Sequence, residues 1–131
     1  MIKSKKLNKF KGINHAFFNS MGGKSTGIFK SLNCGHGSTD TKKNILKNLI
    51  IVREKISTYS KKIILLNQIH SSKFYFIDKN SKLLKNKFRG DALITNKIRL
   101  PIAVLTADCA PILIHDHKAK MIAAIHAGSK G

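Results

Sequence analysis

The chain has 131 residues, of which 42% are hydrophobic, so it can build one domain with an apolar core and is not compositionally disordered. Its 25 lysines and arginines face only 6 acidic residues, which gives a formal net charge of +19. This charge raises the hypothesis of nucleic-acid binding. However, the lysines are scattered along the chain, and no aromatic-rich nucleic-acid motif interleaves with them. We therefore expect no specific nucleic-acid partner.

The cysteine content and the lengths of the apolar runs indicate the cellular compartment. Two cysteines, Cys34 and Cys109, are too few for a disulfide framework. No apolar run approaches the roughly 20 residues of a membrane span. The basic N-terminus lacks the apolar stretch of a signal peptide. We expect a cytoplasmic protein without membrane contact, in which thiols stay reduced and free to bind metal.

The first part of the chain predicts one helix after a long loop. Residues 1–13 are basic and aperiodic, and we expect a frayed start within a single domain spanning 1–131. His15–Phe18 is a short apolar run and a candidate strand. Residues 19–37 contain five glycines, and loops of this length are usually functional or disordered. Apolar residues then recur at helical spacing from Ile45 to Ile56, which predicts one buried helix face.

Six short runs after the helix predict a sheet. Several are continuously apolar, which is typical of strands buried on both faces. One helix followed by many strands favours an α+β fold over regular βαβ alternation. The predicted strands are Ile63–Gln68, Phe74–Ile77, Ala92–Thr95, Ile102–Thr106, Ile112–His115 and Met121–Ile125.

Three residues with metal-binding side chains, His70, Cys109 and His126, each follow an apolar run. We expect them at strand ends, where one thiolate and two imidazoles can meet. Zinc accepts sulfur and nitrogen ligands, and a catalytic zinc site typically has three protein ligands and one open position. The long intervals between the three residues are unlike the tight cysteine pairs of structural zinc sites, so the spacing alone is not diagnostic.

Other candidate ligands are less suited to a metal site. His115 and His117 flank Asp116 in a predicted turn, where exposure is the expected state. Cys34 and His36 lie together in the glycine-rich loop, but two ligands do not complete a zinc shell.

Several motifs resemble those of one family. Gly90–Asn96, Thr106–Leu113 and His126–Gly128 are similar to motifs of the YfiH family, also called the laccase-domain or multicopper polyphenol oxidase family. Gln68–His70 resembles the family's Q-V-H motif. The segment from His15 to Asn33 resembles its N-terminal glycine-rich motif. Members are described as purine nucleoside phosphorylases that also deaminate adenosine and cleave methylthioadenosine.

The resemblance implies a layered α/β sandwich, incomplete at the C-terminus, with a catalytic zinc bound by His70, Cys109 and His126. Copper is the alternative metal, because one thiolate with two imidazoles also suits it. The implied substrates are a purine nucleoside and phosphate. Asp108, beside Cys109, is the best carboxylate for acid/base work. A homodimer is the expected assembly.

Three departures from the family pattern motivate alternatives. Ser129 and Lys130 stand where the family has Trp and Arg, and Ser20 stands in place of another Arg. Family members also continue well beyond this point. One alternative is therefore an inactive truncated or split-gene remnant. Another is a cysteine hydrolase with Cys109 as nucleophile and His126 as base.

Overall fold

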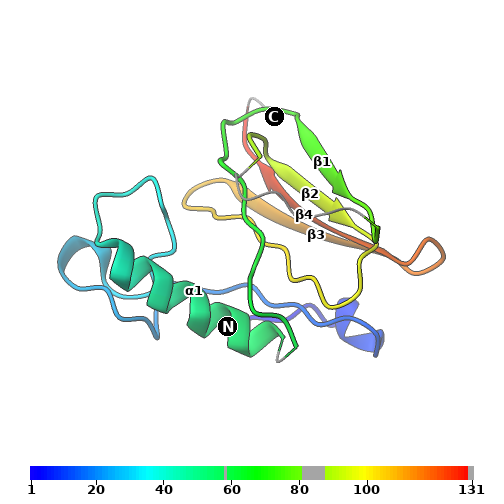
Figure 1. The fold of residues 1–131 in the computed structure, drawn as a ribbon, viewed down its shortest axis with the longest axis horizontal. Coiled ribbons are helices and arrows are strands. Elements are labelled where there is room, and N and C mark those ends of the chain that lie inside the picture. The colour runs from blue at the N-terminus through cyan, green and yellow to red at the C-terminus, as the bar shows by residue number, and fades with distance from the viewer. Residues whose placement is uncertain (58, 81–87, 130–131) are drawn as a thin grey trace. The chain divides into compact units, whose positions relative to one another are not determined.

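The computed structural model describes residues 1–57, 59–80 and 88–129. The chain forms two compact units, Met1–Lys62 and Ile63–Gly131 (Figure 1). Within the described ranges, no helix is long and apolar enough to cross a membrane.

The first unit contains the predicted helix, α1, which spans Lys42–Ile56. Thr41 caps its start, because the Thr41 hydroxyl accepts a hydrogen bond of 3.2 Å from the Asn44 N–H. Ile45 and Val52 are buried on the predicted apolar face. The periodicity of the sequence therefore located this helix and its core-facing side.

The N-terminal residues of this unit have ordered backbone contacts. Ile2 forms an antiparallel bridge with Phe17, with two hydrogen bonds of 2.8 Å. The ring of buried His15 accepts a hydrogen bond of 2.7 Å from the Ser4 N–H. A short 3-10 helix, η1, spans Leu7–Lys9. His15–Phe18 therefore contributes an isolated bridge, and the strand expected there is not formed.

A buried polar network holds the glycine-rich loop against α1, and a second 3-10 helix, η2 (Gly27–Phe29), lies within this loop. Asn48 of α1 is fully buried. Its carbonyl oxygen accepts from the Lys24 N–H at 2.7 Å. Its amide donates to the Ser25 hydroxyl at 2.9 Å and to the Asn33 carbonyl at 2.7 Å. The Ser25 hydroxyl in turn donates to the Asp40 carboxylate. Side chains thus satisfy loop groups that have no strand to pair with.

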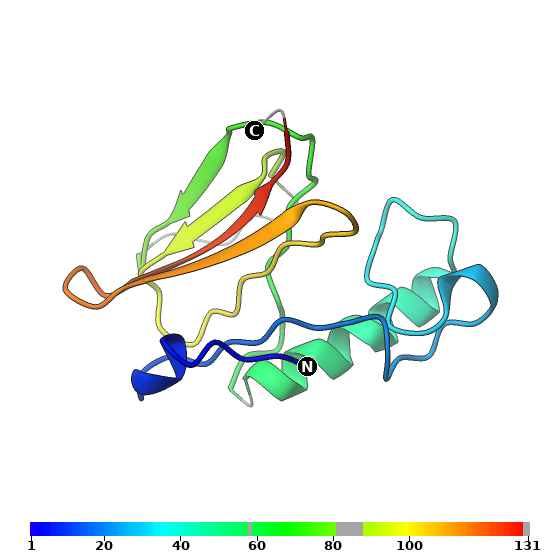
Figure 2. The same cartoon turned by 180° about the vertical axis from the view of Figure 1, so that it is seen from behind.

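The second unit is built on a four-stranded sheet. Its strands are β1 (Phe74–Ile77), β2 (Ala92–Thr95), β3 (Ala110–Asp116) and β4 (Met121–Ala127). They lie side by side in the order β1-β2-β4-β3, as both views show (Figures 1 and 2). β1 and β2 are parallel, whereas β4 is antiparallel to both β2 and β3. Within the described residues, one α-helix and a mixed sheet confirm the predicted α+β class.

The two faces of this sheet differ in burial. Leu93 and Ile77 point to the core face and pack with Leu66 and Leu100 from flanking segments. The opposite face carries exposed apolar side chains on the two edge strands. The expectation that these strands are buried on both faces was therefore wrong for β1 and β3. The exposed side chains are Phe74, Phe76, Ile112 and Ile114.

In the second unit, two predicted strands are not formed. Ile63–Gln68 and Ile102–Thr106 run side by side, but only one parallel bridge joins them, between Ile64 and Ile102. Further along the two segments, hydrogen bonds from the Gln68 side chain take the place of the backbone hydrogen bonds of a strand pair. Its amide donates to the Leu105 carbonyl at 2.6 Å, and its carbonyl accepts from the Leu105 N–H at 2.7 Å.

The hairpin that joins β3 and β4 also differs from the expected turn. His115 belongs to β3, where it pairs with Ile122 of β4. The turn itself covers residues 117–120. Asp116 ends β3, and its carboxylate accepts a hydrogen bond of 2.9 Å from the Ala119 N–H. The turn prediction was therefore two residues too early, because the polar His115 continues the strand alternation.

Candidate metal centre

The β3–β4 hairpin brings Cys109 and His126 together. His126 is the next-to-last residue of β4 and pairs with Pro111 of β3, and Ala110 pairs with Ala127. Cys109 directly precedes β3, so its expected place at the end of a strand was wrong. The outcome is nevertheless the same, because the beginning of one antiparallel strand lies beside the end of its partner.

The third residue, His70, lies in the loop that precedes β1. Its φ of 57° places the backbone in the left-handed region, which is uncommon for a residue with a side chain. The two hydrogen bonds between Gln68 and Leu105 tie this loop to the segment that leads to Cys109. The Gln68 side chain therefore helps to bring the His70 loop to the hairpin.

The three candidate ligands form one cluster. One ligand atom each from His70, Cys109 and His126 can be chosen such that all lie within 4.8 Å of one another. The two rings meet edge to face, with centroids 5.0 Å apart. Donors around a tetrahedral zinc lie roughly 3.3–3.6 Å apart, given zinc bonds of about 2.0–2.3 Å. Small movements would therefore suffice to close these three side chains on an ion.

The burial of the three side chains is graded. His126 is buried, Cys109 is half-buried and His70 is exposed. The cluster is therefore buried on the side of His126 and open to solvent on the side of His70. A nitrogen–sulfur donor set with one open side fits a metal that also contacts a small molecule.

Gly128 keeps the cluster open. It follows β4 and lies opposite Cys109 in the continuation of the hairpin register. A Cβ atom at this position would lie 3.3 Å from the Cys109 Sγ and 3.5 Å from the His70 Cδ2. The absence of a side chain thus leaves space beside the sulfur and the ring.

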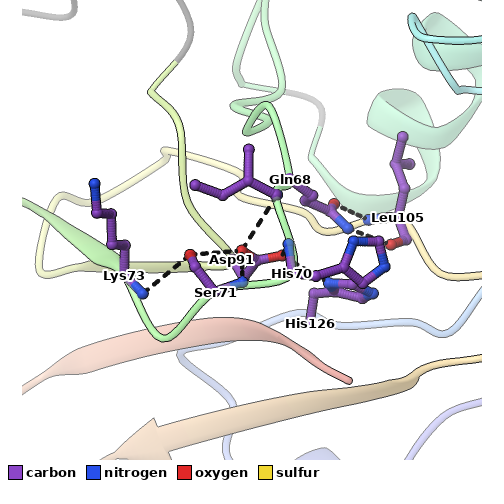
Figure 3. Close-up of polar contacts among 8 residues, drawn as sticks. Gln68, His70, Ser71, Lys73, Asp91, Leu105 and His126 are labelled. Atoms are coloured by element: carbon purple, nitrogen blue, oxygen red, sulfur yellow. Dashed lines mark hydrogen bonds and ion pairs between the residues drawn. The ribbon is translucent and has the colours of Figure 1, made fainter. Parts of the chain in front are cut away.

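A buried carboxylate, Asp91, lies beside two of the three candidate ligands, His70 and His126 (Figure 3). Its Oδ1 lies 2.8 Å from the His126 Nδ1. The carboxylate also accepts hydrogen bonds from the N–H groups of the His70 loop, over residues 69–71. Asp91 is only 2% exposed. It directly precedes β2, and the Asp91 carbonyl accepts from the His126 N–H at 2.7 Å.

The surroundings of Asp91 keep its carboxyl ionised. Burial alone would raise the pKa of Asp91, but it is outweighed. Hydrogen bonds from the Ser71 N–H, from His126, from the Ser71 hydroxyl and from the Ile69 N–H hold that pKa well below the ordinary value. A buried negative charge is therefore maintained directly behind the cluster.

Sequence reasoning gave Asp91 no role beyond its place in the family motif. One signal could have singled it out: the chain has only 6 acidic residues, and this one begins an apolar strand. A buried carboxylate needs partners, so an acidic residue at the start of a core strand predicts a bound cation or donor cluster.

The other sequence candidates lie outside the cluster. Asp108 is exposed in the loop before Cys109. The ring of His115, in β3, lies 5.9 Å from the ring of His117, in the hairpin turn. Cys34 belongs to the first unit, where burial raises the pKa of its thiol to about 11. Within the described residues, the three-ligand cluster is the group suited to a metal ion.

Two of the three positions that depart from the family pattern lie within the described residues, one in each unit. Ser129 is exposed after β4, and Lys130 lies outside the described residues. Ser20 is exposed in the first unit, where its carbonyl accepts from the Ser31 and Leu32 N–H groups at 3.0 and 2.7 Å.

Residues 14–131 match the family described as multi-copper polyphenol oxidoreductase laccase. The chain belongs to this family. Its recognition as a YfiH-type protein from the Cys109 and His126 motifs is thereby confirmed.

Two relatives with assigned functions are similar over nearly the whole chain. A purine nucleoside phosphorylase of Bacteroides thetaiotaomicron is 30% identical over 100% of this chain and 51% of its own length. A purine nucleoside phosphorylase of Corynebacterium glutamicum is 33% identical over 91% of this chain and 48% of its own length. The chain spans about half the length of these relatives.

A solved structure supports the fold. The YfiH protein of Bacillus licheniformis superposes with a TM-score of 0.73, at 24% identity, over 82% of this chain and 42% of that protein. The described elements therefore correspond to part of the YfiH fold, as the sequence motifs predicted.

Proposed function

We propose that the cluster holds a catalytic zinc in an enzyme of the purine nucleoside phosphorylase type. The observation that carries the proposal is the convergence of His70, Cys109 and His126 in a chain whose relatives bear that name. Zinc is favoured because two neutral imidazoles and one thiolate are ligands that it commonly takes, and copper is the alternative.

The proposed reaction is phosphorolysis of adenosine, inosine or guanosine. Phosphate adds to C1′ of the ribose as the bond from C1′ to the purine breaks, and the purine leaves with a proton. A zinc ion bound by the three residues would supply positive charge and Lewis acidity beside the substrate. The open side of the cluster, at exposed His70 and Gly128, is where a substrate can reach it.

Asp108 is the proposed acid/base residue. It is exposed, immediately precedes Cys109 and lies on the loop that leads into β3. A carboxyl at this position can hold or donate the proton that the departing purine needs. Deamination of adenosine and cleavage of methylthioadenosine are further proposed activities, since they use related substrates.

The test is phosphate-dependent release of hypoxanthine from inosine, together with the zinc content of the purified chain. We expect one zinc per chain, and we expect Cys109→Ser to lose both zinc and turnover. Cys34→Ser is the matched control, because Cys34 lies in the other unit. Equal turnover in the wild type and Cys109→Ser would exclude the proposed site. Stoichiometric zinc without turnover in the wild type would favour the inactive remnant.

A second candidate is a cysteine hydrolase. The pairing of Asp91 with His126 at 2.8 Å, close to Cys109, favours it, because a carboxylate that orients a histidine beside a thiol is the arrangement of cysteine nucleophiles. A zinc-free chain that is rapidly alkylated at Cys109 would support this chemistry. Protection of Cys109 from alkylation by added zinc would support the metal centre.

A further inference from the structure

We propose that Asp91 is the positioning residue of the centre, the single group that sets both the ring of His126 and the backbone of the His70 loop for metal binding. The inference rests on the proposed metal centre. Asp91 acts through the two histidine ligands and contacts neither the metal nor the substrate.

Asp91 sets the tautomer of the His126 ring. An ionised carboxylate can only accept hydrogen bonds, so the His126 Nδ1, 2.8 Å from the Asp91 Oδ1, must carry the hydrogen. The two side chains are 4% and 2% exposed, so water does not compete for the bond. Nε2 is thereby left without a hydrogen in the neutral ring, as a metal ligand requires.

Asp91 also binds the backbone of the loop that carries His70. The N–H groups of Ile69, His70 and Ser71 donate to the Asp91 carboxylate at 3.3, 3.1 and 2.7 Å. The Ser71 hydroxyl adds a bond of 2.9 Å. Successive N–H groups that converge on one anion form a concave binding site, and the left-handed backbone of His70 is what turns them inward. Asp91 therefore stabilises an otherwise unfavourable backbone conformation.

The Asp91 side chain makes all of these bonds. Oδ1 accepts from the His70 N–H and from His126, whereas Oδ2 accepts from the Ile69 and Ser71 N–H groups and from the Ser71 hydroxyl. Asparagine has nearly the same shape but only one acceptor oxygen. Its amide NH₂ would face either the Ser71 N–H or the His126 N–H, and two donors do not bond.

The experiment compares Asp91→Asn with Asp116→Asn. Both variants change a carboxylate to an amide in the second unit, but Asp116 is exposed at the hairpin turn, where it bonds the Ala119 N–H. Zinc affinity is measured by competition with a chromophoric chelator. We expect Asp91→Asn to bind zinc roughly 10–100-fold more weakly than the wild type. We expect Asp116→Asn to match the wild type.

Two further readouts separate positioning from general loss of structure. In the cobalt-substituted protein, Asp91→Asn should change the intensity and position of the cobalt absorption bands, which report ligand geometry. In the metal-free wild type, proton–nitrogen correlation spectra should show the hydrogen of neutral His126 on Nδ1. Ser71→Ala removes one of the bonds to the Asp91 carboxylate, and the bond from the Lys73 N–H, but keeps the carboxylate itself. It should therefore weaken zinc binding less than Asp91→Asn does.

The outcomes distinguish this inference from the proposed function. A wild-type chain that binds no zinc would overturn the metal centre and this inference together. A wild type that binds zinc, beside a folded Asp91→Asn variant of equal affinity, would overturn the role of Asp91 alone. If Asp91→Asn does not fold, the wild-type spectrum decides, because a hydrogen on Nε2 of His126 contradicts the proposed role.

Discussion

Residues 1–62 and residues 63–131 hold irregular backbone in place by similar means, but only the second region combines those means with a regular sheet. In the first, buried Asn48 of α1 ties down the glycine-rich loop. In the second, buried Asp91 ties down the loop before β1. Each side chain supplies the hydrogen bonds that a loop cannot obtain from a neighbouring strand.

The difference between the two side chains is their charge. Asn48 is a neutral amide whose bonds all go to polar groups of the same unit, so it can organise a loop without attracting a cation. Asp91 is an anion that also bonds the ring of His126. A buried carboxylate behind a histidine prepares that ring to bind a positive ion. The first unit therefore uses its buried polar residue for structure, whereas in the proposed metal centre Asp91 also prepares a ligand.

The largest expected effect separates the two cysteines. We expect Cys109→Ala to reduce zinc affinity by at least about 100-fold, because it removes one of the three proposed protein ligands. Cys34→Ala should leave the affinity unchanged, since Cys34 lies in the other unit and burial raises the pKa of its thiol to about 11. Chelator competition on both variants checks this. Equal losses of affinity in the two variants would contradict the assignment.

The next effect concerns Asn48. Asn48→Ala removes three hydrogen bonds made by a fully buried side chain and leaves the Lys24 N–H and the Asn33 carbonyl without that partner. We expect a loss of about 2–4 kcal/mol in the free energy of unfolding, measured by denaturant titration. Asn8→Ala, at an exposed site of the same unit, should cost less than about 0.5 kcal/mol. If Asn48→Ala lowers the zinc affinity as well as the stability, this result would contradict the proposed distinction between the units.

A smaller effect is expected at Gly128. The methyl group of Gly128→Ala would lie 3.3 Å from the Cys109 Sγ, closer than an ordinary contact, so the sulfur must shift. We expect zinc affinity to fall by roughly 3- to 10-fold, in line with mild displacement of one ligand. Gly12→Ala is the control, because a Cβ at Gly12 meets nothing within 4 Å. Unchanged affinity in Gly128→Ala would show that the cluster tolerates a side chain there.

The smallest effect is a pH dependence of stability in the first unit. The Ser25 hydroxyl bond is the largest of the influences that lower the pKa of Asp40 in the folded chain, and it outweighs partial burial. A lowered folded pKa means that the stabilisation is complete above the ordinary carboxyl range and is lost as the pH falls through the folded pKa. At pH values below about 4, we expect the urea concentration at the unfolding midpoint to decrease, and to decrease less in Asp40→Asn than in the wild type. Parallel acid profiles would exclude this contribution.

Local pattern was enough to locate much of the secondary structure. The spacing from Ile45 to Ile56 gave α1, and four apolar runs gave the strands of the sheet, with ends within a few residues of those observed. Ile63–Gln68 and Ile102–Thr106 were equally apolar but did not become strands, because Gln68 takes over their pairing through its side chain. Apolar content measures burial, and it does not say which groups satisfy the backbone.

The sequence by itself determined which side chains are available as ligands, because thiol and imidazole chemistry belongs to Cys109, His70 and His126 wherever they lie. Only the tertiary structure decided that the three meet within 4.8 Å and that Asp91 stands behind two of them. The physical reason is that these contacts join residues far apart in the chain. They depend on the register of β3 against β4 and on the backbone turn at His70, and neither is encoded in any local pattern.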